Sequence, residues 1–439
     1  MLVKIKNNFF KKVVEVVINR LLKTPLIRNV AIISSGAVVS QIIAFLSTPL
    51  ITRIYGPDVY GQAGIITNIF TILSPIAALT LPMAIVIPDK EEVAYNLKKL
   101  SYRIVFSFSF LVMLVILLFN NQIIDIFNLE SVSSFLLFIP LATLLSGLKE
   151  TQEYWNIRQR DYKILTQASV IGALVTNIGK VIGGLFSPFA GVIVFFQSTR
   201  QGVTALMVKI LSRKKVKNEN FIKISSINLL HEYKEFPLFK APQTFIDALT
   251  QGLPVLLLSI LFGPSSVGFY NVCLTSLSIP TTLIGKAVSD VIFPEISNAA
   301  NNKIPINPIL KKVTLTLTGL GLLPYGIIFF FGPQIFQIFF GEEWLVAGQY
   351  AIWISFWSFS SFIITPAIKS ILVLGMQKFH LNYTIISLLI RFLMLFLGYY
   401  FFNDDLVAIM LFGLSSSMFN FILLAFIFSR AKKFDLANL

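Results

Sequence analysis

The sequence predicts an all-α polytopic membrane protein with about twelve transmembrane helices in two six-helix lobes. Three observations predict it: a highly apolar composition, twelve apolar runs of membrane-spanning length, and an internal repeat relating the two halves. Hydrophobic residues make up 55% of the 439 residues and charged residues only 13%, whereas soluble domains carry roughly 25% charged residues. The composition therefore excludes a soluble enzyme, a disordered chain and a nucleic-acid-binding protein.

Each of the twelve runs is long enough to cross a bilayer, which requires about 20 apolar residues for about 30 Å of hydrocarbon. The runs lack the two-residue alternation of transmembrane strands, so helices are predicted. The third and fourth are the weakest because they are short and rich in serine. In chain order they are residues 29–51, 62–87, 101–119, 131–150, 164–186, 189–210, 241–262, 267–293, 309–331, 347–373, 380–401 and 406–428.

The basic residues predict the orientation. Thirty of the 36 Lys and Arg residues lie in or beside the loops on the side of the two termini, and one, Arg53, lies in a loop on the other side. This asymmetry places both termini in the cytoplasm and supports an even number of spans. It also explains the net charge of +15 without nucleic acid, because the basic loops face anionic lipid headgroups.

The polar segments divide the chain into five parts. In residues 1–28 basic residues flank an apolar stretch from Val13 to Ile18, which is typical of an interfacial amphipathic helix. The longest polar segment, 211–240, separates six spans from six and is predicted to be a cytoplasmic linker. The predicted parts are the basic segment 1–28, an N-lobe at 29–210, the linker 211–240, a C-lobe at 241–428 and a cytoplasmic tail at 429–439.

A repeat links the two halves. The first hairpin contains Gly56-Pro57 and then Gly61, and Gly263-Pro264 and then Gly268 follow 207 residues later, in the corresponding loop of the second half. Because six spans return the chain to its starting side, both copies have the same orientation. Two parallel halves predict a pseudo-two-fold axis along the membrane normal and two lobes with a cavity between them.

Motifs for catalysis are missing from the sequence. Gly179-Lys180 is followed by Val181, so it is not a phosphate-binding loop of the Walker type, and no HExxH pattern occurs. The chain has two histidines and one cysteine. We therefore expect no catalytic residue, no metal site and no cofactor.

The informative residues are ionisable groups inside the spans. Each cation costs about 2.5–3.5 kcal/mol at mid-membrane, so such residues usually face a cavity or a partner. The cations outnumber the carboxylates, which predicts an anion site. These residues are Lys180, Arg200, Lys286, Lys369 and Arg391 against Asp247 and Asp290.

Two arginines are the main candidates for substrate binding. Arg200 and Arg391 each lie about 11 residues into a span, roughly 16 Å deep at 1.5 Å per residue, and one belongs to each lobe. Arginine binds phosphate through a planar fork of donors. We expect an anion site for a diphosphate or anionic sugar shared between the lobes, with Lys180 and Arg53 as further candidates. The alternative is that Arg200 and Arg391 each bind a helix-end carbonyl or a carboxylate of another helix.

The remaining charged residues in the spans form a second group. Lys286 and Asp290 share a helix face at i,i+4 spacing, and Asp247 lies at a comparable depth in the neighbouring span. A structural ion-pair cluster is favoured here. The alternative is that Asp247, Asp290 and Lys286 couple transport to a proton or sodium ion.

Neutral polar residues in the spans include Gln41, Gln251 and Asn271. They could bind sugar hydroxyls but more often join helices by hydrogen bonds. Trp353 and Trp357 lie one turn apart, and an aromatic belt at the outer membrane surface is favoured over a platform that stacks on sugars.

Four stretches carry a family resemblance. They are residues 49–61 (PLITRIYGPDVYG), Ile85 to Leu97, the WNIR tetrapeptide at 155–158, and the segment from Phe236-Pro237 to Pro294-Glu295. In this order they resemble the Wzx-type polysaccharide (O-antigen) flippases of the multidrug/oligosaccharidyl-lipid/polysaccharide exporter superfamily. The resemblance covers residues 25 to about 300 well and the rest mainly by span pattern.

The resemblance implies two six-helix lobes in a V shape about a central cavity. It also implies a secondary transporter rather than an enzyme. It implies a multi-pass protein of the bacterial inner membrane that moves polyprenyl-diphosphate-linked oligosaccharide from the cytoplasmic to the outer leaflet, with coupling to H+ or Na+ left open. A polysaccharide polymerase and a chain-length regulator are candidate protein partners. A multidrug antiporter for cations is disfavoured by the excess of intramembrane cations. A membrane glycosyltransferase or polymerase is disfavoured by the short outside loops.

Overall fold

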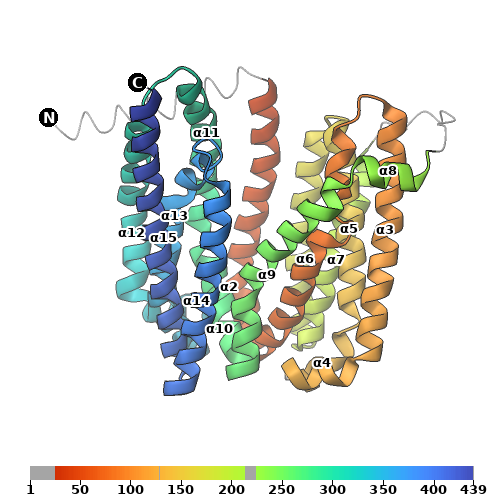
Figure 1. Cartoon of the computed structure of the whole chain (residues 1–439). Coiled ribbons are helices and arrows are strands. Elements are labelled where there is room, and N and C mark those ends of the chain that lie inside the picture. The colour runs from red at the N-terminus through yellow and green to blue at the C-terminus, as the bar shows by residue number, and fades with distance from the viewer. Residues whose placement is uncertain (1–24, 128, 213–223, 439) are drawn as a thin grey trace.

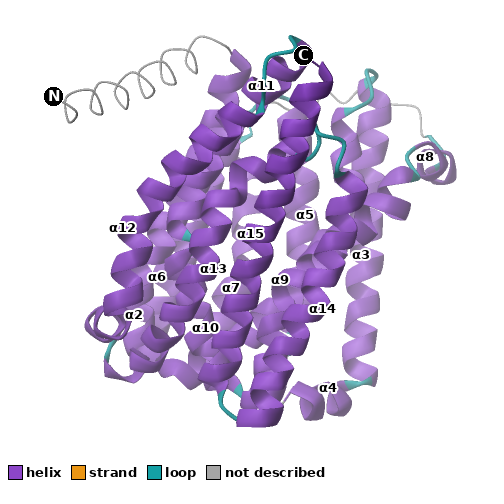
Figure 2. Cartoon of the chain, turned by 60° about the vertical axis from the view of Figure 1, so that its left-hand side comes forward, coloured by secondary structure: helices purple, strands orange, loops and turns teal. Residues whose placement is uncertain are grey.

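The computed structural model describes residues 25–127, 129–212 and 224–438, and these residues contain helices, turns and loops but no strand. Figure 2 shows helices connected by short loops. Nine segments of the described chain are long and apolar enough to span a membrane. The chain is therefore a multi-pass, all-α membrane protein, as predicted.

Every predicted span overlaps with helical structure. The first of the nine segments, Ser35–Ile76, contains two predicted spans joined by a sharp turn. The predicted sixth and eighth spans correspond to α7 and to α10 through α11, which fall outside those nine segments. Of the predicted basic segment 1–28, residues 1–24 lie outside the described residues.

Two groups of helices lie side by side (Figure 1). The N-lobe group is α2 (Pro25–Leu73), α3 (Glu91–Leu118), α5 (Phe138–Arg158), α6 (Tyr162–Phe186) and α7 (Ala190–Leu211). The C-lobe group is α9 (Ala241–Phe262), α10 (Pro264–Leu277), α11 (Lys286–Asn301), α12 (Asn307–Phe340), α13 (Leu345–Ser370), α14 (Gln377–Phe402) and α15 (Asp405–Asn438).

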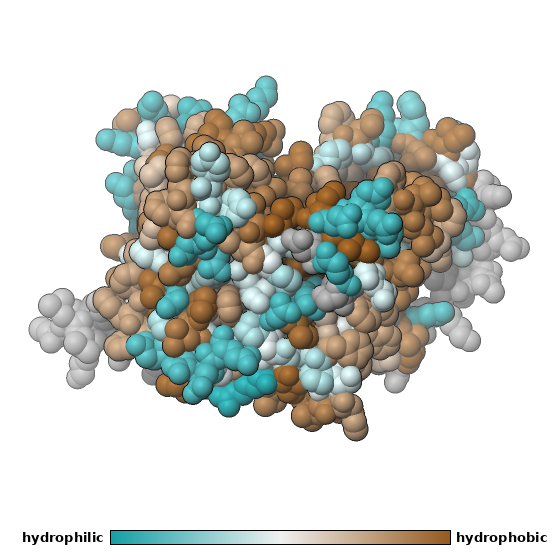
Figure 3. Space-filling view, turned by 90° about the horizontal axis from the view of Figure 1, so that it is seen from below, coloured by the Kyte–Doolittle hydropathy of each residue, from teal (hydrophilic) through white to brown (hydrophobic). Residues whose placement is uncertain are grey.

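Two short helices mark opposite sides of the molecule. Helix α4 (Asn120–Phe127) lies at the bottom of Figure 1, and α8 (Ser226–Glu232) lies at the top with the C-terminal end. We call these the α4 side and the C-terminal side; the sequence predicts that the C-terminal side is cytoplasmic. Figure 3 looks at the α4 side, where hydrophilic residues gather in patches across the middle and hydrophobic residues occupy much of the flanks.

The two Gly-Pro motifs form the same kind of turn. In α2 the chain reverses at Gly56, with φ 68° and ψ 171°. Between α9 and α10 it reverses at Gly263, with φ 88° and ψ −177°. Glycine adopts positive φ without a steric penalty, and the proline that follows is well suited to a first helical position because it needs no amide donor. The local sequence therefore explains both reversals on the α4 side.

The second span of each lobe is broken, although the sequence predicts continuous runs. After α2 the chain forms the 3-10 turns η1 (Ser74–Ile76) and η2 (Leu81–Val86), with Leu79 and Thr80 at positive φ between them. After α10 it passes through the π-helix η5 (Thr281–Gly285), which leads directly into α11. Pro75 and Pro280 lie at the two breaks. A proline inside a helix removes a backbone donor and clashes with the preceding turn, which accounts for the interruptions.

Three of the resemblance motifs meet on the C-terminal side of the N-lobe. Arg158 donates to the carbonyl oxygens of Ile85 (3.2 Å), Pro88 (2.6 Å) and Asp89 (3.2 Å). The hydroxyl of Thr80 donates to the carbonyl of Phe236 at 3.1 Å. These hydrogen bonds connect the end of α5 and the segment that begins at Phe236 to the turn η2. The apolar side chains of this region pack with Leu229 of α8.

Candidate functional site

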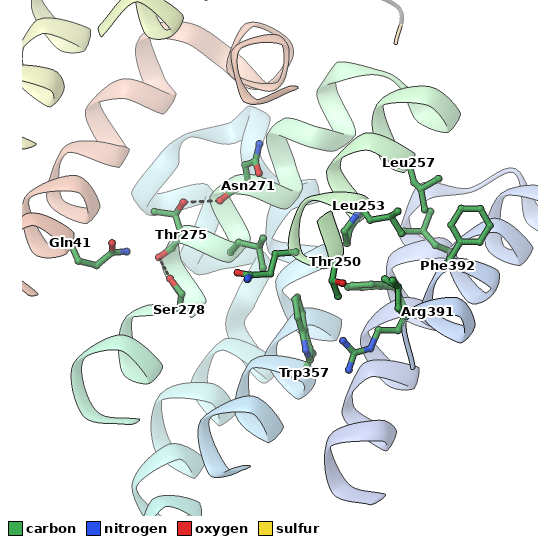
Figure 4. A pocket seen from close by; sticks show the side chains of 16 residues that line it. Gln41, Thr250, Leu253, Leu257, Asn271, Thr275, Ser278, Trp357, Arg391 and Phe392 are labelled. Atoms are coloured by element: carbon green, nitrogen blue, oxygen red, sulfur yellow. Dashed lines mark hydrogen bonds between the residues drawn. The ribbon is translucent and has the colours of Figure 1, made fainter. Parts of the chain in front are cut away.

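A cavity of about 490 Å³ lies mainly within the C-lobe and reaches the N-lobe at Gln41 of α2 (Figure 4). Helices α9, α10, α13, α14 and α15 supply the rest of its wall. The volume is within the usual range of about 300–1,000 Å³ for small-molecule sites.

Arg391 is the charged residue of this wall. It projects from the middle of α14, and Figure 4 shows its guanidinium directed towards the space beside Trp357. Its Nε atom is buried and has no hydrogen-bond partner among the described residues. Two tyrosines, Tyr270 and Tyr383, lie near it, and no carboxylate is among the residues that line the cavity. Because a half-buried cation without a carboxylate partner is costly in a membrane, this arrangement favours an anionic ligand.

The remaining polar wall is neutral and follows one face of α10. Asn271, Thr275 and Ser278 are spaced so that they lie on the same side of the helix. Hydroxyl hydrogens of Thr275 and Ser278 donate to backbone carbonyls at 2.9 and 3.2 Å, which leaves oxygen lone pairs available to a ligand. Thr250 and Gln251 of α9 lie on the neighbouring wall.

Trp357, one of the two tryptophans for which the sequence favours an aromatic belt, lines the cavity. Its ring packs edge-on against Phe412, with centroids 5.3 Å apart and an interplanar angle of 81°. That contact holds the ring in place at the wall. The residues the sequence analysis did not select are Thr250, Thr275 and Ser278; the i, i+4, i+7 spacing of Asn271, Thr275 and Ser278 was the available signal.

Lys180 and Arg200 lie together in the N-lobe and are not among the residues that line the cavity. Lys180 on α6 donates to the Oε1 atom of Gln197 on α7 at 2.6 Å, and it interacts electrostatically with Arg200. The structure therefore groups these two cations with each other and not with Arg391. Within the repeat, Lys180 is on the fifth span of its lobe, the span that corresponds to α14.

Arg53 lies on the α4 side and bridges the two lobes. Its Nη2 atom donates to the carbonyl oxygen of Ile338, near the end of α12, at 2.6 Å. This is a helix-end carbonyl contact of the kind that the sequence left open for Arg200 and Arg391. Arg53 is not among the residues of the cavity wall.

The candidates for ion coupling lie on α9 and α11. Asp247 is exposed on α9, one turn before Gln251, and interacts electrostatically with His380 at the start of α14. Lys286 and Asp290 lie on α11, but their side chains are outside the described part of the structure. Lys369 is exposed at the end of α13. The side chains of His, Cys, Asp and Glu that the structure describes form no cluster able to hold a metal ion.

The model of a family described as polysaccharide biosynthesis proteins matches residues 50–350. The chain belongs to this family. The match includes the reversal at Gly56, the broken second spans and the α9 and α10 walls of the cavity, so the fold and much of the site lie inside the family's region. None of the curated proteins matches this chain.

Solved structures with the same fold are transporters and a flippase. The lipid II flippase MurJ in an inward closed conformation has a TM-score of 0.69 at 15% identity, covering 92% of this chain and 90% of that one. An inward-facing multidrug transporter of the MATE family in the MOP superfamily has 0.64 at 12% identity, covering 90% and 95%. An outward-facing MATE transporter has 0.51 at 13% identity, covering 95% and 98%. The likeness confirms the two-lobed fold class predicted from the sequence.

Proposed function

We propose that this protein is a flippase that moves polyprenyl-diphosphate-linked oligosaccharide repeat units from the cytoplasmic to the outer leaflet of the bacterial inner membrane by alternating access. Both termini would lie in the cytoplasm. The observation that carries the proposal is Arg391, whose Nε atom has no partner among the described residues, in a cavity whose other polar and apolar lining residues are all uncharged. Membership of a polysaccharide biosynthesis family and a flippase-like fold support it.

Each part of the cavity suits one part of such a lipid. The guanidinium of Arg391 offers a charged fork of donors to a diphosphate. Neutral side chains such as Asn271 and Gln251 can exchange hydrogen bonds with sugar hydroxyls. Trp357 offers an aromatic face to a sugar ring. A cavity of about 490 Å³ is large enough for the diphosphate and the first sugar, while the polyprenyl chain would stay in the lipid.

A multidrug antiporter for organic cations is the second candidate, because MATE transporters share the fold. The cavity wall argues against it. Its charged residue is an arginine, and no carboxylate is among the residues that line it. A cation site is expected to carry negative charge. A wall with the opposite charge therefore favours an anionic substrate.

The test of the site is Arg391→Ala beside Arg391→Lys. We expect Arg391→Ala to reduce surface polysaccharide at least about tenfold at unchanged protein level, since a hydrogen bond to a charged group is worth about 1.5–3 kcal/mol. Arg391→Lys should restore part of the loss because it keeps the charge. Lys369→Ala, at an exposed position outside the cavity wall, is the control. Full polysaccharide from Arg391→Ala would remove Arg391 from the substrate site.

The test of the function is the location of the lipid-linked repeat units in a deletion strain. Flipping predicts that they remain on the cytoplasmic leaflet, inaccessible to a glycan probe added outside. Repeat units that reach the outer leaflet as in the parent strain would exclude this function.

A further inference from the structure

The second spans of the two lobes pack against each other with exchanged partners. A Cβ atom at Gly61 of α2 would lie 1.8 Å from the carbonyl oxygen of Pro264, and one at Gly268 of α10 would lie 2.2 Å from the carbonyl oxygen of Pro57. Pro57 and Pro264 are 207 residues apart, as are Gly61 and Gly268. This reciprocity is the mark of a two-fold contact, here between the two halves of one chain.

Some residues of one half contact the residue that occupies the equivalent repeat position, 207 residues away, in the other half. Ser265 Oγ donates to Asp58 Oδ1 at 3.3 Å, and these positions are again 207 residues apart. A Cβ atom at Gly64 would lie 2.3 Å from Nδ2 of Asn271, its equivalent in α10. We call residues 57–64 of α2 and 264–271 of α10 the α2–α10 seam.

The glycines of the seam are needed because the two helices come very close together there, and not because the backbone adopts an unusual conformation. Gly61 and Gly268 are not among the residues with positive φ. Real Cβ atoms do not come within 3.0 Å of a carbonyl oxygen, so neither position accepts a side chain while the helices touch. Small residues at such positions let two membrane helices pack backbone to backbone. The requirement for glycine therefore belongs to the contact between the lobes.

The seam lies between the cavity and the α4 side. Asn271 belongs both to the seam and to the cavity wall. From there Thr275 and Ser278 continue the cavity wall along α10, away from the turn at Gly263. Two further contacts between the lobes lie on the α4 side: Arg53 with the carbonyl of Ile338, and the Nε1 atom of Trp344 with the carbonyl of Thr52 at 3.2 Å. None of the seam's described contacts is an ion pair.

We propose that the α2–α10 seam is the gate that closes the cavity towards the α4 side, and that Gly61 and Gly268 are the residues that allow it to shut. The lobes part at this seam to expose the cavity on the α4 side and meet there again when it closes. The proposal rests on the alternating access of the proposed function but not on the identity of the substrate.

The test measures the access of a cavity residue from the α4 side. Thr275→Cys is introduced with Cys273→Ser, and a membrane-impermeant thiol reagent is added to intact cells. We expect Gly268→Ala, which cannot close, to raise labelling from outside at least tenfold. Gly319→Ala and Gly326→Ala on α12 are controls, because a Cβ atom there meets nothing within 4 Å. Labelling unchanged by Gly268→Ala at normal protein level would overturn the gate.

A disulfide provides a test that does not depend on the folding of the glycine variants. Asp58→Cys with Ser265→Cys should oxidise readily across the seam, abolish outside labelling of Thr275→Cys and stop polysaccharide export, and a reductant should reverse both effects. Continued labelling and export by the cross-linked protein would also overturn the proposal. If the labelling follows the seam but the deletion strain still places repeat units outside, the gate stands and the proposed substrate falls.

Discussion

Arg158 is the residue whose loss should weaken the N-lobe most sharply on the C-terminal side. It donates to three backbone carbonyls at the end of the broken second span, two of them in partly buried positions. A hydrogen bond to a charged group is worth about 1.5–3 kcal/mol. Because Nη1 serves two acceptors and the contact with Asp89 is exposed, we expect Arg158→Ala to lower the free energy of local opening by about 2–4 kcal/mol.

The assay is hydrogen exchange of residues 81–90 followed by mass spectrometry, in purified protein. A loss of about 2–4 kcal/mol corresponds to exchange faster by about 30- to 1,000-fold in this segment. Arg158→Lys should recover part of the protection, since an ammonium has no planar fork with which to reach all three carbonyls. Arg160→Ala, at an exposed position two residues further on, is the control. Protection unchanged in Arg158→Ala would refute the reasoning.

Two other predictions follow from single contacts. Asp435 accepts hydrogen bonds from the backbone amides of Ile306 and Asn307 at 2.8 and 2.9 Å. Asp435→Ala should therefore destabilise the start of α12 by about 1–2 kcal/mol, measured as a lower Tm of the protein. The control Lys433→Ala should leave the Tm unchanged. Trp357→Leu should weaken binding of a sugar-bearing lipid about 2- to 10-fold, as expected for the loss of an aromatic contact of about 0.5–1.5 kcal/mol. Trp353→Leu, outside the cavity wall, is its control, and equal affinity in both variants would exclude stacking on Trp357.

The sequence indicates part of the candidate site, because polar and charged residues inside spans can be recognised by their type alone. It selected Arg391, Gln41, Gln251 and Asn271 as polar groups inside spans, and the structure places all four at the cavity. It gave Arg200 the same standing as Arg391, because the two have the same depth and neither has a neighbouring carboxylate. The direction of a side chain around its helix depends on how that helix packs, and this is where the two arginines differ.

The sequence by itself determined the class of the protein and its two-lobed plan. Span length, composition and the Gly-Pro repeat are local properties of the chain, and the membrane imposes one solution on them. Only the tertiary structure decided that Lys180 and Arg200 lie together, that Trp357 faces the cavity and that Gly61 meets Pro264. Each of these depends on the rotation and approach of helices that are distant in sequence, which no local pattern specifies.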